Sequence, residues 1–325
     1  MRNILAGLAV VCTLVSAPAV DAQTSSSSSS SSPFYFSGIL GAEFAQTISY
    51  SSTFGIADLT FGLEPVSYGS LPGIGLEFGY WGIGGESTLN DGTFFGALTV
   101  DLGGGRLHVG APRSATDGFS DTPAPGGGLL TEVSIGHGFA AVPRARWYAL
   151  AVDTTFLGVR YDRTSGPLSY AISARQAEDA LLGLMTDFGL GFSRTQGDTR
   201  IFGTLDVFRF APGTRTAAML GGSMMVGGET ATRWPTEIGG SLIYVHNGFG
   251  GSFTTAGANL YATAQATDRL SVTAAVSHGF YGGGGNLYGL SMLYDLHDGL
   301  MLHGGTSIWS GSDAIMLSLG LRRNL

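Results

Sequence analysis

The residue types that perform catalysis or bind metals are scattered along this sequence. The six histidines include no pair with the i, i+4 spacing of a metal site on a helix. No strict G-x-G-x-x-G, Walker-type phosphate loop or G-x-S-x-G elbow occurs, so nucleotide binding and an elbow serine have no support. We therefore predict no enzyme, no cofactor and no metal. A hydrolase whose serine, histidine and orienting group meet only in space is the less favoured alternative.

Charged residues concentrate instead around one long connection, residues 112–154. Alternation in the flanking segments 105–111 and 155–162 places their charged side chains on one face. If the connection folds inward, seven side chains would line a constriction: Asp117, Asp121, Glu132, Arg106, His108, Arg160 and Asp162. Opposed charges across water would set a transverse field that filters solutes by polarity and size. The alternative is a solvated loop face on the outside.

The composition indicates which elements must position these residues. Charged residues make up only 12% of the chain, against roughly 25% in soluble proteins. Glycine is abundant, with 53 of 325 residues, aromatics reach 11%, and no apolar run has the ~18 residues of a spanning helix. Few charges, much glycine and many aromatics favour a β structure that faces lipid on one side.

Alternation with a period of two residues is the dominant pattern beyond residue 33. In Ile315–Leu321 every odd position is a large aliphatic residue, and in Ile74–Tyr80 Glu77 lies on the face opposite four apolar side chains. We predict about 16 such strands, most near the ~9–11 residues of a tilted spanning strand. Because no linker divides residues 33–325 and lipid tolerates no open sheet edge, we expect one closed barrel with a water-filled lumen. A soluble all-β protein is the less favoured reading.

The prediction is thus an all-β, transmembrane antiparallel β-barrel of about 16 strands, whose long third outer loop, 112–154, folds inward. Two points stay open. Segments Leu129–Phe139 and Trp147–Asp153 could be two further strands, giving about 18. Residues 175–185 have local helical character, although a loop that runs into the next strand is favoured.

The first 32 residues differ from the rest. Residues 1–22 have the pattern of a secretory signal, with Arg2, an apolar core over Ile4–Val15 and a small-residue cleavage site. Residues 23–32 are a Ser-rich flexible linker, and the barrel domain is expected over 33–325. The one cysteine, Cys12, lies in the leader, so the mature chain is expected to have no disulfide.

The charge balance argues against a nucleic-acid partner. Acidic residues number 24 and basic residues 16, for a formal net charge of −8, and every basic residue is arginine. Phosphate binding needs clustered basic residues, which this chain lacks. Four further acidic side chains are expected to line the pore: Glu43, Asp58, Glu77 and Asp206.

The sequence resembles the general porins of Gram-negative outer membranes, nearest the alphaproteobacterial kind. The motifs that carry the resemblance are short: Gly75–Gly79, Asp91–Leu98 followed by Gly105–Gly110, Tyr288–Leu296 and Ser318–Arg322. The resemblance implies an inward constriction loop after strand 5, a homotrimer and an outer-membrane location. The chain departs from the family in its end, which is Leu325 rather than an aromatic residue.

We therefore expect a passive diffusion channel for small hydrophilic solutes and ions, with a weak cation preference because acids outnumber bases. The alternative is a plugged structural or adhesive barrel that binds a partner through its loops. A sugar-specific channel would need a row of inward rings, and alternation alone does not place Phe95, Phe202 and Phe208.

Overall fold

The structure is a computed structural model that describes most of the chain beyond residue 32. The described ranges are 33–46, 51–66, 72–85, 91–119, 122–123, 125–127, 155–179, 183–211, 213–227, 234–248, 253–280, 285–310 and 314–325. The predicted leader and the Ser-rich linker lie outside these ranges, as do Asp121 and Glu132.

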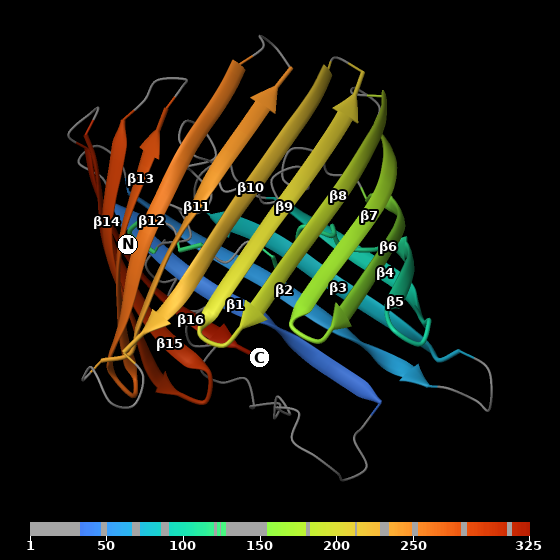
Figure 1. Cartoon of the computed structure of the whole chain (residues 1–325), viewed down its shortest axis with the longest axis horizontal. Helices are drawn as coiled ribbons and strands as arrows, with labels where there is room; N and C mark the ends of the chain where they lie inside the picture. Colours follow the sequence, from blue (N-terminus) through green and yellow to red (C-terminus); the bar gives the residue numbers. More distant parts are fainter. Residues whose placement is uncertain are drawn as a thin grey trace.

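Sixteen strands make up the described fold (Figure 1). Their bounds, in chain order, are β1 Phe34–Gln46, β2 Ser51–Val66, β3 Ile74–Gly85, β4 Asp91–Asp101, β5 Arg106–Ala111, β6 Leu157–Ser165, β7 Leu168–Asp179, β8 Gly183–Gln196, β9 Thr199–Phe210, β10 Gly213–Val226, β11 Thr236–Asn247, β12 Phe253–Thr267, β13 Leu270–Gly279, β14 Asn286–His297, β15 Leu300–Trp309 and β16 Ala314–Asn324. Residues 175–179, part of the segment with local helical character, form the end of β7. Among the described residues, no helix is long and apolar enough to cross a membrane.

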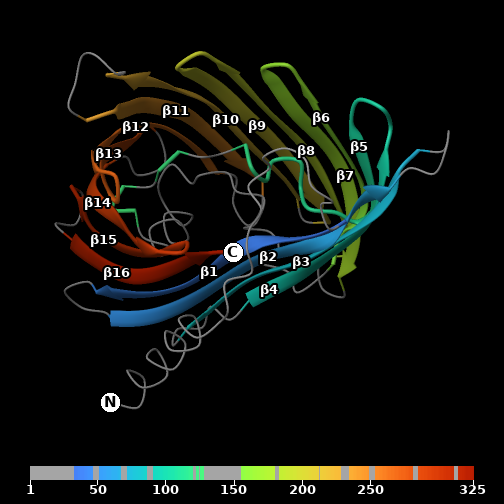
Figure 2. The same cartoon turned by 90° about the horizontal axis from the view of Figure 1, so that it is seen from below.

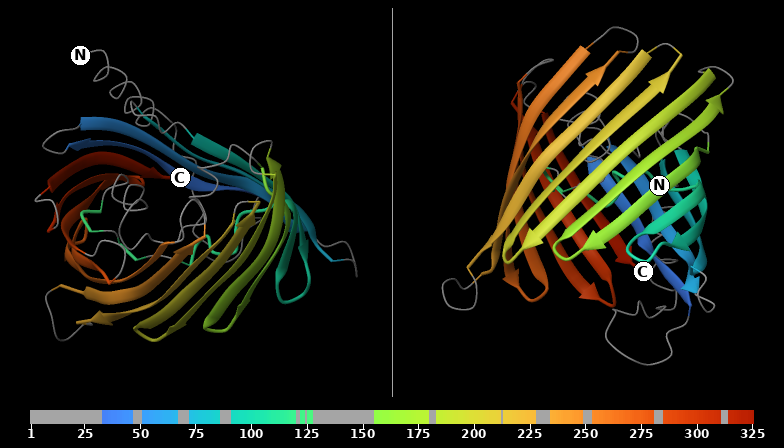
Figure 3. Two further views of the ribbon diagram at one scale, coloured as in Figure 1. Left: turned by 90° about the horizontal axis from the view of Figure 1, so that it is seen from above. Right: turned by 45° about the vertical axis from the view of Figure 1, so that its right-hand side comes forward.

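Each strand pairs antiparallel with its neighbours in sequence, and β16 pairs with β1, which closes the ring (Figures 2 and 3). The predicted 16-stranded antiparallel barrel is therefore confirmed. β5 pairs directly with β6, and Gly110 lies opposite Gly158. The ring of described strands therefore closes with 16, and the two further segments of the 18-strand alternative, Leu129–Phe139 and Trp147–Asp153, lie outside the described residues.

The two faces of the sheet follow the period of two. On β8 the odd positions Met185 and Asp187 are buried, whereas Leu184 and Phe188 point outward and are exposed. The same outward exposure holds for Val109, Val159 and most other large apolar side chains of the strands. An apolar outer belt of this kind is what a lipid-facing barrel presents.

Tight turns join the strands at one end of the barrel. Gly166–Pro167, Gly197–Asp198, Asp268–Arg269 and Asp298–Gly299 each link two strands with two residues, at the end where β1 begins and β16 stops. At the last of these turns both residues have positive φ, 49° for Asp298 and 75° for Gly299, as in the mirror-image turns that match strand twist.

Candidate pore constriction

The chain leaves the barrel wall at the end of β5, which stops part of the way up the barrel. This strand has only six residues and pairs with the Gly96–Asp101 half of β4. Its next-to-last residue, Gly110, has φ +133°, and a Cβ there would lie 2.6 Å from the carbonyl oxygen of Gly96. Only glycine fits this bend, and Pro112 then offers no N–H to continue the ladder. The connection therefore starts inside the height of the barrel and not at its rim.

We call the described residues 112–119, 122–123 and 125–127 the strap. They lie inside the ring of strands in the views along the barrel (Figures 2 and 3). Arg113 anchors the near end on β2: its guanidinium lies 2.8 Å from Asp58 Oδ1 and donates to Thr60 Oγ1 at 2.8 Å and to the Leu59 carbonyl at 3.0 Å. The same group stacks over Phe95 of β4, 4.6 Å from the ring centre.

The opposite side of the near end is held by β6 and β7. Arg175 Nη1 donates to the carbonyl oxygen of Pro112 at 3.2 Å, and Arg160 Nη1 donates to that of Ser114 at 3.2 Å. The amide of Ala115 donates to Ser173 Oγ at 2.9 Å. Arg175 is itself paired with Asp187 of β8. Residues 112–117 are thus fixed between two parts of the wall by hydrogen bonds and ion pairs.

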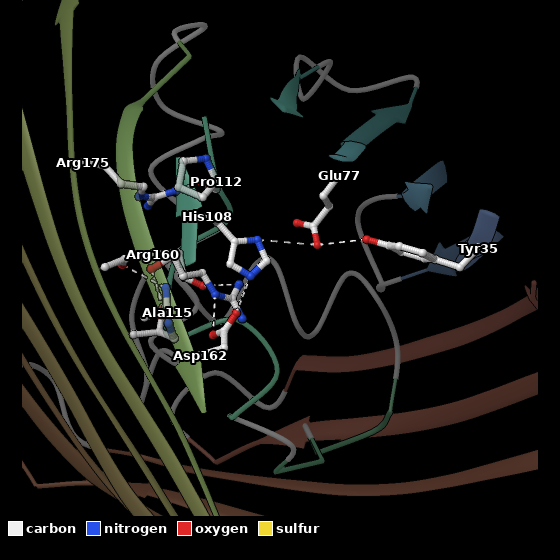
Figure 4. A network of polar contacts seen from close by, with 11 residues as sticks. Tyr35, Glu77, His108, Pro112, Ala115, Arg160, Asp162 and Arg175 are labelled. Atoms are coloured by element: carbon white, nitrogen blue, oxygen red, sulfur yellow. Dashed lines mark hydrogen bonds and ion pairs between the residues drawn. The ribbon is translucent and has the colours of Figure 1, made fainter. Parts of the chain in front are cut away.

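A charged network continues along the inner wall beside this anchor (Figure 4). His108 Nε2 lies 2.9 Å from Asp162 Oδ2, and Arg160 Nε donates to Asp162 Oδ1 at 2.8 Å. Glu77 Oε2 lies 3.9 Å from His108 Nδ1 and accepts from the hydroxyl of Tyr35 at 3.3 Å. The network therefore joins β1, β3, β5 and β6.

Seven side chains form what we call the charged cluster: Asp58, Glu77, His108, Arg113, Asp117, Arg160 and Asp162. Asp117 joins it through Arg113, at 3.8 Å. Two cavities, of about 650 and 450 Å³, open beside the cluster and share Glu77, His108, Arg160 and Asp162 in their linings. The lumen is thus polar and hollow at this wall.

The other predicted site residues lie elsewhere. Arg106 pairs with Glu64 at 2.5 Å in an exposed position, although it lines the larger cavity. Glu43 is buried beneath His303, with 3.7 Å between Oε2 and Nε2, and Gly320 of the intervening β16 leaves the room for them to meet. Asp206 is buried on β9, next to Asp187. The role of all these residues in a constriction stays a prediction.

Sequence reasoning missed Arg113 and Arg175 as anchors. Arg113 directly follows Pro112 in the connection, and this position gives no sign of an anchor. Its partners on β2 lie more than 50 positions away, and no local pattern could indicate them. Among the described residues there is no group of three or more His, Cys, Asp or Glu that could hold a metal ion.

Another part of the inner wall is apolar. The inward side chains Phe202 of β9, Ala217 and Met219 of β10, and Ile243 and Val245 of β11 pack together and are at most 4% exposed. We call them the apolar wall. A second cluster is formed by Phe156, which directly precedes β6, together with Ala177 of β7, Met185 of β8 and Phe208 of β9. Phe202 and Phe208 thus contribute to packed clusters, and Phe95 lies under Arg113.

The fold can be compared with solved structures. One variant of the porin of Rhodopseudomonas blastica is 13% identical, with a TM-score of 0.62, and covers 90% of this chain and 100% of its own. A triple mutant of the same porin is 12% identical, with a TM-score of 0.64 and the same coverage. No protein-family model matches the sequence, and no curated protein matches it in sequence either. The chain therefore has the porin fold, and the predicted resemblance is confirmed at the level of fold.

Proposed function

We propose that this protein is an outer-membrane porin of a Gram-negative bacterium, a passive channel for small hydrophilic solutes and ions. The observation that carries the proposal is the charged cluster, which stands beside hollow space inside a closed barrel. The apolar outer belt supports a membrane setting, because large apolar side chains exposed around a whole sheet favour lipid. The structural neighbours are named as porins, which supports the same assignment.

The charge count of the cluster supports a weak cation preference. Asp58, Glu77, Asp117 and Asp162 contribute −4, and Arg113 and Arg160 contribute +2, so the formal net charge of these six residues is −2. Acids and bases are interleaved rather than placed in opposed rows. Paired charges cancel at a distance, so the field acts over a few ångströms and discriminates modestly between ions.

The test is a planar-bilayer recording of the purified protein. We expect stepwise conductance and a reversal potential of the sign for cation preference in a salt gradient. A barrel plugged for adhesion, the alternative function, would insert without conductance steps. Conductance steps with an anion preference would support the channel function but reject the cation preference inferred from the charge of the cluster.

The leader and the assembly belong to the same proposal. Residues 1–22 would direct export, residues 23–32 would lie in the periplasm before β1, and three copies would associate in the membrane. Protease added to intact cells should spare residues 23–32, and chemical cross-linking should stop at trimers. Cleavage of these residues in intact cells would contradict the proposed orientation in the membrane. Cross-linking that stops at dimers would reject the trimer.

A further inference from the structure

The far end of the strap contacts the barrel wall at a patch of glycine and serine residues. Pro123 accepts a hydrogen bond from Asn259 Nδ2 of β12 at 3.0 Å, and Pro125–Gly127 then lie on β14 and β15. Four inward residues of these two strands form what we call the seat: Gly289, Ser291, Gly305 and Ser307. In the ladder Gly289 pairs with Ser307 and Ser291 with Gly305, so the four make a compact patch.

The strap contacts the seat through backbone atoms. A Cβ added to Gly305 would overlap the carbonyl oxygen of Gly126, and one added to Gly289 would overlap the nitrogen of Gly126. These are main-chain atoms, which cannot rotate away as the end of a side chain can. Gly126 and Pro125 are buried, and Ser307 beneath them is only 2% exposed although it faces the lumen. The fit therefore depends on small residues on both sides of the contact.

The two ends of the strap are held by different kinds of interaction. The near end is held by Arg113, Arg160 and Arg175 through charged hydrogen bonds. The far end has close backbone packing and, among its described residues, a side-chain hydrogen bond from Asn259. Packing of this kind has no tolerance for an added methyl group, because the neighbours cannot relax without moving the chain.

We propose that the seat positions the far end of the strap across the lumen and thereby sets the size and selectivity of the passage. The strap would be a bar fixed at both walls, and the seat residues would determine specificity without touching the solute. This inference rests on the proposed channel function. It assigns to Gly289 and Gly305 a role that their lack of a side chain makes possible.

The experiment compares Gly305→Ala with Gly304→Ala. The two substitutions add the same methyl group at adjacent positions of β15, but Gly304 faces outward, where a Cβ would lie 3.2 Å from Met292 Cε and 3.6 Å from Leu319 Cδ1. Both contacts are ends of flexible side chains. We expect Gly304→Ala to keep the wild-type single-channel conductance and ion selectivity, and Gly305→Ala to change both.

A second measurement needs no conductance. In Ser307→Cys the thiol should resist a water-soluble reagent because the strap covers it, whereas in Ser37→Cys, at an exposed position that lines the smaller cavity, it should react. Adding Gly305→Ala to Ser307→Cys should abolish the protection, and adding Gly304→Ala should preserve it. The only native cysteine, Cys12, lies in the predicted leader.

The outcomes separate the two proposals. If the wild type conducts and Gly305→Ala behaves as Gly304→Ala in both measurements, the seat proposal is overturned. If no variant conducts but thiol protection follows the pattern above, the channel proposal fails and the seat stands as a structural contact. If Gly305→Ala does not fold, the two single cysteine variants decide. A Ser307→Cys thiol that reacts with the reagent would overturn the seat proposal. A Ser307→Cys thiol that resists the reagent, while the Ser37→Cys thiol reacts, would support it.

Discussion

The inner wall formed by β2, β3, β5 and β6 carries the charged cluster, whose Asp58 and Arg160 contact the strap, whereas on β9, β10 and β11 five inward side chains form the buried apolar wall. Both regions belong to one closed sheet and obey the same alternation. Alternation therefore decides which face a side chain takes but not whether that face meets water. Because the apolar wall is almost fully buried, we expect solutes to pass along the charged cluster.

The largest effect should come from removing a ring of the apolar wall. Phe202→Ala deletes a side chain that is 1% exposed, and such deletions cost roughly 3–5 kcal/mol. The matched control is Ile201→Ala, at an outward neighbour that is 48% exposed and should lose much less. Urea unfolding in lipid vesicles measures both free energies of unfolding. Equal losses would show that Phe202 is not packed, and the contrast between the two regions would be lost.

The near anchor should give the next effect. Arg113→Ala leaves Asp58 without its 2.8 Å partner in a largely buried position, which costs about 3 kcal/mol. Arg106→Ala breaks a pair whose side chains are 35% and 50% exposed, and should cost less than about 1 kcal/mol. We also expect Arg113→Ala, and not Arg106→Ala, to raise current noise as the strap loosens. Similar unfolding energies for the two variants would reject Arg113 as an anchor.

Ion selectivity gives a smaller but more direct test. Asp117→Asn removes one negative charge from the cluster and should lower the cation-to-anion permeability ratio, most clearly at low salt, where screening is weak. Asp206→Asn, which replaces a buried acid on β9 away from the charged cluster, should shift the ratio less. Reversal potentials in a salt gradient measure both. A larger shift for Asp206→Asn would place the passage on the other side of the lumen.

The smallest expected effect concerns Tyr35. Tyr35→Phe deletes the hydroxyl that donates to Glu77 at 3.3 Å, a long hydrogen bond worth about 0.5–1.5 kcal/mol at most. We expect a conductance equal to the wild type and a small loss of stability in the same urea titration. A large change in conductance would mean that the network positions Glu77 through Tyr35, which would extend the charged cluster to β1.

Much of the wall could be predicted from the sequence, because a slip of one residue would exchange the two faces of a strand. That constraint placed His108, Arg160 and Asp162 together on the inward face opposite Leu107 and Val159. An inward fold of the connection was predicted, but the anchors of the strap could not be, since they are distant in sequence and follow no repeating pattern. The apolar wall was missed because Ile201 and Phe202 are both apolar, so composition gives no sign of which faces the lumen.

The buried pair of Glu43 and His303 bears on how the ring closes. Gly320 lies on β16, between β1 and β15, and it pairs with Glu43 on one side and with His303 on the other. A slip of β16 by one position would bring Leu319 or Leu321 into that gap, and a branched side chain there would separate the two partners, which is costly for a buried carboxylate. The contact between Glu43 and His303 over Gly320 therefore favours the observed register of β16 over one shifted by a residue.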